Sequence, residues 1–250
     1  NAGVSSSSTG SELALYRAVL ERYQPDVLVL VFWVGNDLAD NSFELTRAPR
    51  LYFDLDASGR LVQLPFAFEP SPVAGWLDRW SRFYVWQKTA FRQLRGSVHA
   101  ATRRLEPVEL VFAEPEPGPV AHAWAITAAL LHVFREETAA RGTTLVLVAA
   151  PSAVQVYDDL WGELEGRAGR EDTPVSREHP EARLAGIARR EGIPFLALLP
   201  AFRGAAPGRD STRPGEQLYY EGRFHWNDAG NTLAAGAVHE LLLTVVQSGP

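Results

Sequence analysis

The chain has 250 residues, 46% of them hydrophobic, so it is long enough to form one globular domain with a sizeable core. Its formal net charge of −6 argues against nucleic acid or an anionic membrane as the main partner. The absence of cysteine excludes disulfides, thiolate catalysis and cysteine metal sites, and no apolar run is as long as a bilayer span. Methionine is absent too, so we expect the gene product to begin upstream of Asn1.

The first predicted elements are a helix and a buried strand. Residues 11–23 repeat apolar side chains at helical spacing. Residues 27–34 (VLVLVFWV) are all apolar, which is typical of a strand covered on both faces by helices. The strand ends in Gly35, Asn36 and Asp37. Ligands bind at the carboxyl ends of parallel strands, so this tripeptide marks a candidate site, although a turn with a helix cap would also explain it.

Residues 42–119 interrupt the alternation of helices and strands. We interpret them as an insertion packed at the strand ends. The pattern of residues 51–64 predicts a hairpin, and residues 114–119 (EPEPGP) form a stiff linker. The stretch 73–95 predicts an aromatic-rich helical piece. We expect most of its aromatic side chains to lie in the core, with one or two lining a substrate pocket.

Further helix and strand units follow the insertion. A helix over 121–140 precedes the apolar strand 144–152 (TLVLVAAPS), and a helix over 181–191 precedes a strand over 195–199 (FLALL). A final helix over 228–246 closes the domain. Helices that alternate with buried strands predict parallel strands joined by right-handed crossovers, and hence an α/β fold with three layers.

A second polar cluster, FHWNDAGN at 224–231, precedes the final helix. Asn227 fits a helix N-cap, and Gly230 permits close packing. His225 therefore lies just outside the helix, at the end of a loop that can reach the edge of the sheet. A single histidine is usually structural, so its role depends on the residues around it.

Four segments resemble, in order and spacing, the later sequence blocks of the SGNH (GDSL-type) hydrolases, and most closely bacterial members with a long insertion after the GND block. They are NAGV at 1–4, GNDLADN at 35–41, APSAVQVY at 150–157 and LYYEGRFHWNDAGN at 218–231. The resemblance implies a three-layer α/β/α sandwich with a parallel flavodoxin-like sheet. It also implies a single domain over 1–250, with an inserted hairpin and helical segment at 42–119.

The resemblance implies a serine esterase or acyltransferase that acts on a small acyl ester, such as an acetyl ester. His225 would be the general base, and the side chain of Asn36 and the backbone N–H of Gly3 would form the oxyanion hole. Fixed donors at a developing oxyanion are each worth about 100-fold to 1,000-fold in rate. A buried strand would therefore serve to aim Asn36. The substrate pocket would be lined by Gly35, Ser152 and Gln155.

The chain departs from the family pattern at the nucleophile. The family's Gly-Asp-Ser block would precede residues 1–4, and no such tripeptide occurs in the chain. We therefore expect the nucleophilic serine upstream of Asn1, on an N-terminal segment of the same protein that completes the sheet. The other candidate hydroxyls are Ser5 to Ser8 and Ser152, which follows a buried strand.

A second departure concerns the carboxylate that orients the histidine. The family places it two or three residues before the histidine, where this chain has Arg223 and Gly222. Glu221 lies one residue further away and is our choice for this role. A histidine base without its orienting acid can lose about 10,000-fold in rate.

The alternative is a catalytically inactive SGNH-like domain that binds an acylated glycan or a protein partner. We expect no cofactor and no metal, because the six histidines show no ligand spacing such as H-x-x-x-H. The expected partner is a small-molecule or glycan ester rather than nucleic acid. The resemblance favours an extracytoplasmic or membrane-anchored location.

Overall fold

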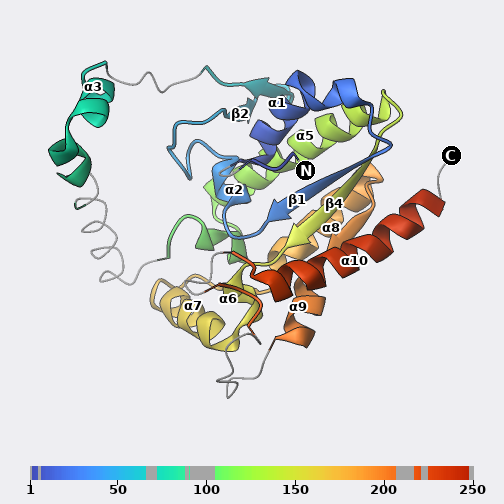
Figure 1. The fold of residues 1–250 in the computed structure, drawn as a ribbon. Helices are drawn as coiled ribbons and strands as arrows, with labels where there is room; N and C mark the ends of the chain where they lie inside the picture. Colours follow the sequence, from blue (N-terminus) through green and yellow to red (C-terminus); the bar gives the residue numbers. More distant parts are fainter. Residues whose placement is uncertain are drawn as a thin grey trace.

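The computed structural model describes residues 2–4, 7–65, 72–87, 90, 105–206, 217–220 and 225–247. Its centre, in these residues, is a parallel sheet with strand order β1-β4-β5 (Figure 1). The strands are β1 (Val27–Trp33), β4 (Thr144–Ala150) and β5 (Phe195–Ala197). In the register of the first pair, Val27 lies opposite Thr144 and Trp33 opposite Ala150. The segments that follow β1 and β4 therefore leave the sheet at the same edge.

Helices cover both faces of this sheet. On one face, Leu30 and Phe32 of β1 join a core built with α1 (Thr9–Ala18), α5 (Gly118–Ala139) and α8 (His179–Glu191). On the other, Val146 and Val148 of β4 pack with α9 (Leu199–Ala205) and α10 (Asp228–Gln247). Alternate residues of each strand thus face opposite layers. The predicted α/β fold with three layers is confirmed.

The long helices follow the predicted pattern closely, whereas two shorter elements differ from it. The first helix begins earlier than predicted, at Thr9, because the side chain of Ser8 caps it. It gives way to a 3₁₀ helix, η1 (Leu20–Tyr23), before Gln24 adopts a left-handed conformation. The strand β5 is shorter than predicted, because α9 begins at Leu199 with a proline in its first turn.

The inserted segment contains the predicted hairpin. Strands β2 (Phe53–Leu55) and β3 (Leu61–Gln63) pair antiparallel. A carboxylate oxygen of Asp56 accepts the backbone N–H groups of Ser58 and Arg60 and so closes the turn. The remaining short elements are α2 (Asp37–Asp40), α3 (Pro72–Trp80), η2 (Glu109–Phe112), α6 (Ala153–Val156) and α7 (Asp158–Arg170).

Most of the described aromatic side chains of the stretch 73–95 lie outside the core. Figure 1 shows α3 well apart from the sheet and its covering helices. Trp76 is 62% exposed, Trp80 70% and Trp86 65%. The expectation that most aromatic side chains of this stretch lie in the core is therefore wrong for these three tryptophans. Helical periodicity gives a helix an apolar face but does not say what covers that face.

Within the described ranges, one helix, α10, is long and apolar enough to cross a membrane by length and composition. A single such helix is weak evidence for a span, since helices that cover a sheet meet the same criterion. Leu233, Ala237, Leu241 and Val245 recur every four residues along α10 and pack against the core that contains Val146 and Val148. These contacts account for one apolar face of the helix.

Candidate active site

The candidate site begins at the turn that ends β1. The Val34 N–H donates to the Ala150 carbonyl at 3.0 Å, and the Asn36 N–H donates to the Trp33 carbonyl at 3.3 Å. The Asp37 carboxylate accepts the Trp33 N–H at 2.7 Å and so holds the turn closed. Burial raises the pKa of this carboxyl well above its usual range. A Cβ at Gly35 would lie 2.6 Å from the Trp33 ring, so only glycine fits there.

The side chain of Asn36 is held by a carboxylate one helical turn away. Its Nδ2 donates to Asp40 Oδ2 at 2.7 Å, and the same oxygen lies 2.6 Å from Arg50 Nη1. Asp40 is only 4% exposed; burial raises its pKa and Arg50 opposes that rise. An amide nitrogen carries two hydrogens, so the bond to Asp40 leaves one for a ligand.

Asn41 joins the same turn to two helices on one face of the sheet. Its Nδ2 lies 3.1 Å from the hydroxyl oxygens of Thr9 and Thr127, and its Oδ1 accepts the Gly10 N–H at 3.4 Å. All of these groups are buried. The second Asp-Asn pair of GNDLADN therefore supports the first: Asp40 orients Asn36, and Asn41 anchors the segment.

The loop that carries His225 is tied to the end of β4. The buried Tyr219 hydroxyl donates to the Pro151 carbonyl at 2.7 Å, and the Tyr220 N–H donates to the His225 carbonyl at 2.9 Å. Asn227 Oδ1 accepts the Gly230 N–H at 3.0 Å, so the predicted N-cap of the last helix is confirmed. These bonds place His225 at the carboxyl edge of the sheet.

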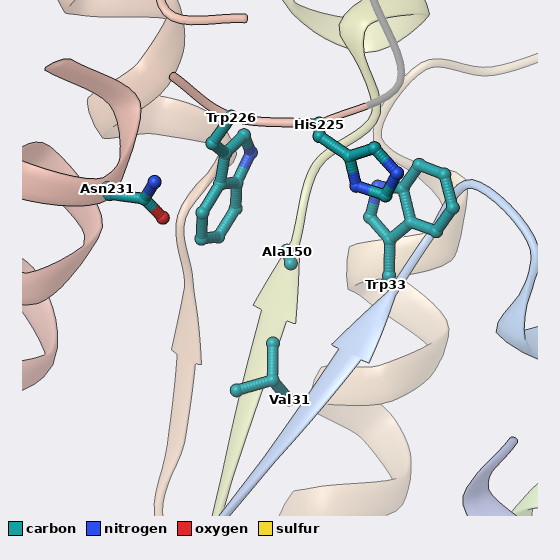
Figure 2. A pocket seen from close by; sticks show the side chains of 6 residues that line it. All are labelled: Val31, Trp33, Ala150, His225, Trp226 and Asn231. Atoms are coloured by element: carbon teal, nitrogen blue, oxygen red, sulfur yellow. The ribbon is translucent and has the colours of Figure 1, made fainter. Parts of the chain in front are cut away.

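His225 lies beside the last residue of β1 (Figure 2). Its exposed ring stacks on the Trp33 ring, with 6.1 Å between centroids and 23° between planes. The two rings border a pocket of about 320 Å³. The pocket is lined by Val31, Trp33, Ala150, His225, Trp226 and Asn231. The turn that bears Asn36 and the loop that bears His225 therefore converge on one edge of the sheet, through Trp33.

Trp33 also lines a second pocket of about 350 Å³, together with Gly35, Ser152 and apolar residues that include Phe112. Two of the predicted substrate-binding residues thus border a cavity. The inserted segment supplies Phe112 to this pocket, but none of its described residues lines the pocket that contains His225. Among the described residues, the aromatic side chains around His225 are thus Trp33 and Trp226, and the insertion contributes Phe112 to the second pocket instead.

The third predicted substrate-binding residue, Gln155, is fully buried. Its Oε1 accepts the Ser152 N–H at 3.2 Å, and its Nε2 lies 2.9 Å from each carboxylate oxygen of Glu181. Glu181 is 7% exposed, and burial raises the pKa of its carboxyl to about 7. Gln155 therefore holds the backbone of Ser152 through a hydrogen bond, and its side chain does not line the pocket beside Ser152.

The remaining candidates are dispersed. Gly3 lies in the exposed segment 2–4, and its role as a donor stays a prediction. Ser8 is buried and caps α1 through Ser11, so its hydroxyl has a structural partner. Ser5, Ser6 and Glu221 lie outside the described residues, and within the described part no hydrogen bond to the His225 ring is found. No group of His, Asp or Glu residues there could hold a metal ion.

Two residues of the site were not among the sequence-based candidates. Trp33 belongs to the predicted strand 27–34, and no signal in the sequence marks it as a site residue. The sequence presents Asp40 only as part of the segment GNDLADN. Its spacing of four residues from Asn36, in a segment that can form a helical turn, could have indicated the contact.

Comparison with known proteins identifies the family. A family model described as an SGNH hydrolase-like domain, acetyltransferase AlgX, matches residues 114–249, slightly more than half of the chain. No curated protein and no solved structure matches the chain. The match supports acyl esterase or acetyltransferase activity in general. Together with the parallel sheet and the histidine at its carboxyl edge, it shows that this chain belongs to the SGNH hydrolase-like family.

Proposed function

We propose that the protein is a serine esterase or acyltransferase that acts on a small acyl ester, such as an acetyl ester. One observation carries the proposal: the His225 ring rests on Trp33, three residues before Asn36, at the carboxyl edge of a parallel sheet. A general base and an amide donor on that edge are the groups that acyl transfer requires.

In the proposed reaction, His225 accepts the proton of a serine hydroxyl while the serine oxygen attacks the ester carbonyl. The second hydrogen of Asn36 Nδ2 and the Gly3 N–H would stabilise the oxyanion of the tetrahedral intermediate. The intermediate collapses, and the alcohol leaves with the proton from His225. Water or an acceptor alcohol then repeats the sequence on the acyl-enzyme. Glu221 is proposed to orient the ring through Nδ1.

We place the nucleophilic serine on a segment upstream of Asn1 that pairs with β1. Supporting this, β1 lies at the edge of the described sheet although all seven of its residues are apolar. Its Val31 is 42% exposed and borders the pocket of His225. An exposed apolar edge is a template for another strand. The proposed unit is then one SGNH domain in which residues 42–119 form an insertion.

The test is hydrolysis of a short-chain aryl ester by the full-length protein. We expect His225→Ala to lower kcat/KM at least about 10,000-fold and Asn36→Ala about 100-fold to 1,000-fold. His239→Ala, on the exposed side of α10, is the matched control and should leave the rate unchanged. Full activity in His225→Ala would refute the proposal.

A non-catalytic binding domain is the second candidate, favoured by Gly222 and Arg223 at the positions where the family has its orienting carboxylate. Isothermal titration of the full-length protein with an acetylated oligosaccharide distinguishes the two. Binding without turnover of any ester supports the second candidate. Loss of esterase activity in Glu221→Gln, with the fold intact, supports the first and assigns the orienting acid.

A further inference from the structure

The helix α3 has an apolar stripe that faces solvent. Val73, Trp76, Leu77 and Trp80 follow the i, i+3, i+4, i+7 spacing, so they share one side of the helix. Val73 is 66% exposed, and the two tryptophans are exposed to a similar extent. Large apolar side chains gathered on one exposed helix face mark an interaction surface.

The apolar surface continues past the end of α3. Phe83 and Trp86 are 64% and 65% exposed, and their rings stack on each other with 6.0 Å between centroids. Val85, between them, is also exposed. We call the exposed apolar residues of segment 72–87 the aromatic ridge. Figure 1 shows α3 away from the rest of the domain, so the ridge is accessible to a broad, flat partner.

The charge around the aromatic ridge is opposite to that of the whole protein. Residues 72–104 contain seven Lys and Arg residues and one acidic residue, Asp78, which gives a net charge of +6. The whole chain has a net charge of −6, so the remainder carries −12. Within the ridge, the guanidinium of Arg79 lies 6.0 Å from the Trp80 ring centroid, and Arg82 is exposed. The ridge itself thus carries two basic residues and one acidic residue, and the other five basic residues follow it in the sequence.

We propose that the aromatic ridge binds the surface of an anionic lipid bilayer. Tryptophan is favoured at the membrane interface because its ring is apolar and its indole N–H is polar. A short amphipathic helix with basic flanks lies in the plane of the headgroups, and each basic residue adds attraction to anionic lipids. The acidic remainder of the protein is repelled by such a surface, so contact is confined to the ridge. The inference from overall net charge differs from this proposal because it averages over the two regions.

The test is co-sedimentation of the full-length protein with lipid vesicles. Vesicles of phosphatidylcholine that contain phosphatidylglycerol should bind the protein at least about tenfold more tightly than phosphatidylcholine alone, and binding should weaken several-fold at high salt. Trp76→Ser/Trp80→Ser should weaken binding at least about tenfold by removing the apolar anchors. Arg79→Glu/Arg82→Glu should have an effect of similar size.

Matched variants separate these effects from changes in folding and net charge. Tyr23→Ser removes an exposed aromatic ring elsewhere, and Arg189→Glu/Arg190→Glu reverses two exposed charges on α8. Both should bind the anionic vesicles like the wild type, and circular dichroism should show every variant folded. Equal binding by Trp76→Ser/Trp80→Ser and the wild type would overturn the proposal. The proposal would also be overturned if the wild-type protein did not bind the vesicles but formed a dimer through the ridge, as measured by light scattering.

Discussion

Asp40 connects the candidate donor Asn36 to a buried cation. Its carboxylate accepts the Asn36 amide and pairs with Arg50, and both charged groups are largely withdrawn from water. Loss of one partner of a buried ion pair leaves the other charge without compensation. We therefore expect Asp40→Ala to lower the free energy of unfolding by about 3 kcal/mol, measured by urea denaturation.

A double-mutant cycle tests the pair directly. Asp40→Asn combined with Arg50→Gln should reveal a coupling energy of about 1–3 kcal/mol. The exposed pair Asp56 and Arg60 provides the comparison. Arg60 is 81% exposed, so the coupling energy of this pair should stay below about 1 kcal/mol. Equal coupling in the two cycles would mean that burial adds nothing to the Asp40 pair.

At this scale the sequence predicted part of the site. The tripeptide at 35–37 was placed correctly at the carboxyl end of a buried strand, because an apolar run followed by a polar turn is a local signal. The stacking of Trp33 on His225 was not predicted, since it joins residues that are far apart in the sequence. Such contacts depend on how the chain folds back, and periodicity carries no information about that.

At the scale of elements, α10 contains two glycines in different surroundings. A Cβ at Gly230 would lie 2.3 Å from the Leu218 carbonyl oxygen, whereas nothing lies within 4 Å of one at Gly236. Alanine favours a helix over glycine by about 1 kcal/mol. We therefore expect Gly236→Ala to stabilise the protein by up to about 1 kcal/mol, and Gly230→Ala to destabilise it by about 1–3 kcal/mol.

Thermal unfolding of the two variants side by side checks this expectation. The same substitution in the same helix gives opposite signs, so helix propensity alone cannot explain both results. Two stabilised variants would show that the loop at Leu218 can move away from the helix at little cost. That result would also weaken the argument that this loop holds His225 in place.

The elements themselves were largely predictable, and their surroundings were not. The helices now described as α5, α8 and α10 were placed to within a few residues, because each has a long periodic pattern and a clear stop signal. The described parts of the aromatic stretch, residues 73–80 and 82–87, are helical as predicted, but most of their aromatic side chains lie outside the core. Whether an apolar face is covered depends on the rest of the molecule, which the local pattern does not contain.

For the whole molecule, buried carboxyl groups should make stability depend on pH. Burial raises the pKa of Glu181, and that of Glu12, from 4.5 to about 7. Between these values the folded protein binds more protons than the unfolded chain, so the free energy of unfolding falls as pH rises through this window. For Glu181 alone the loss is on the order of 3 kcal/mol.

Urea denaturation at about pH 5 and about pH 8 measures this loss. Glu181→Gln cannot ionise, so the variant should lose less stability than the wild type over the same range. Asp159→Asn removes an acidic group from the helix α7 on the surface and is the control. If the wild type and Glu181→Gln showed the same pH dependence, the buried Glu181 carboxyl would not be its source.

Trp33 lines both the pocket of His225 and the pocket beside Ser152, so the two pockets share one side chain. A substitution of Trp33 would therefore alter the shape of both pockets together. A substitution of Trp33 selected because one pocket must accept a larger substrate group would also change the other pocket, which was not under selection. Relatives that diverge in substrate range while keeping Trp33 must do so through residues that line one pocket alone, such as Asn231 or Phe112.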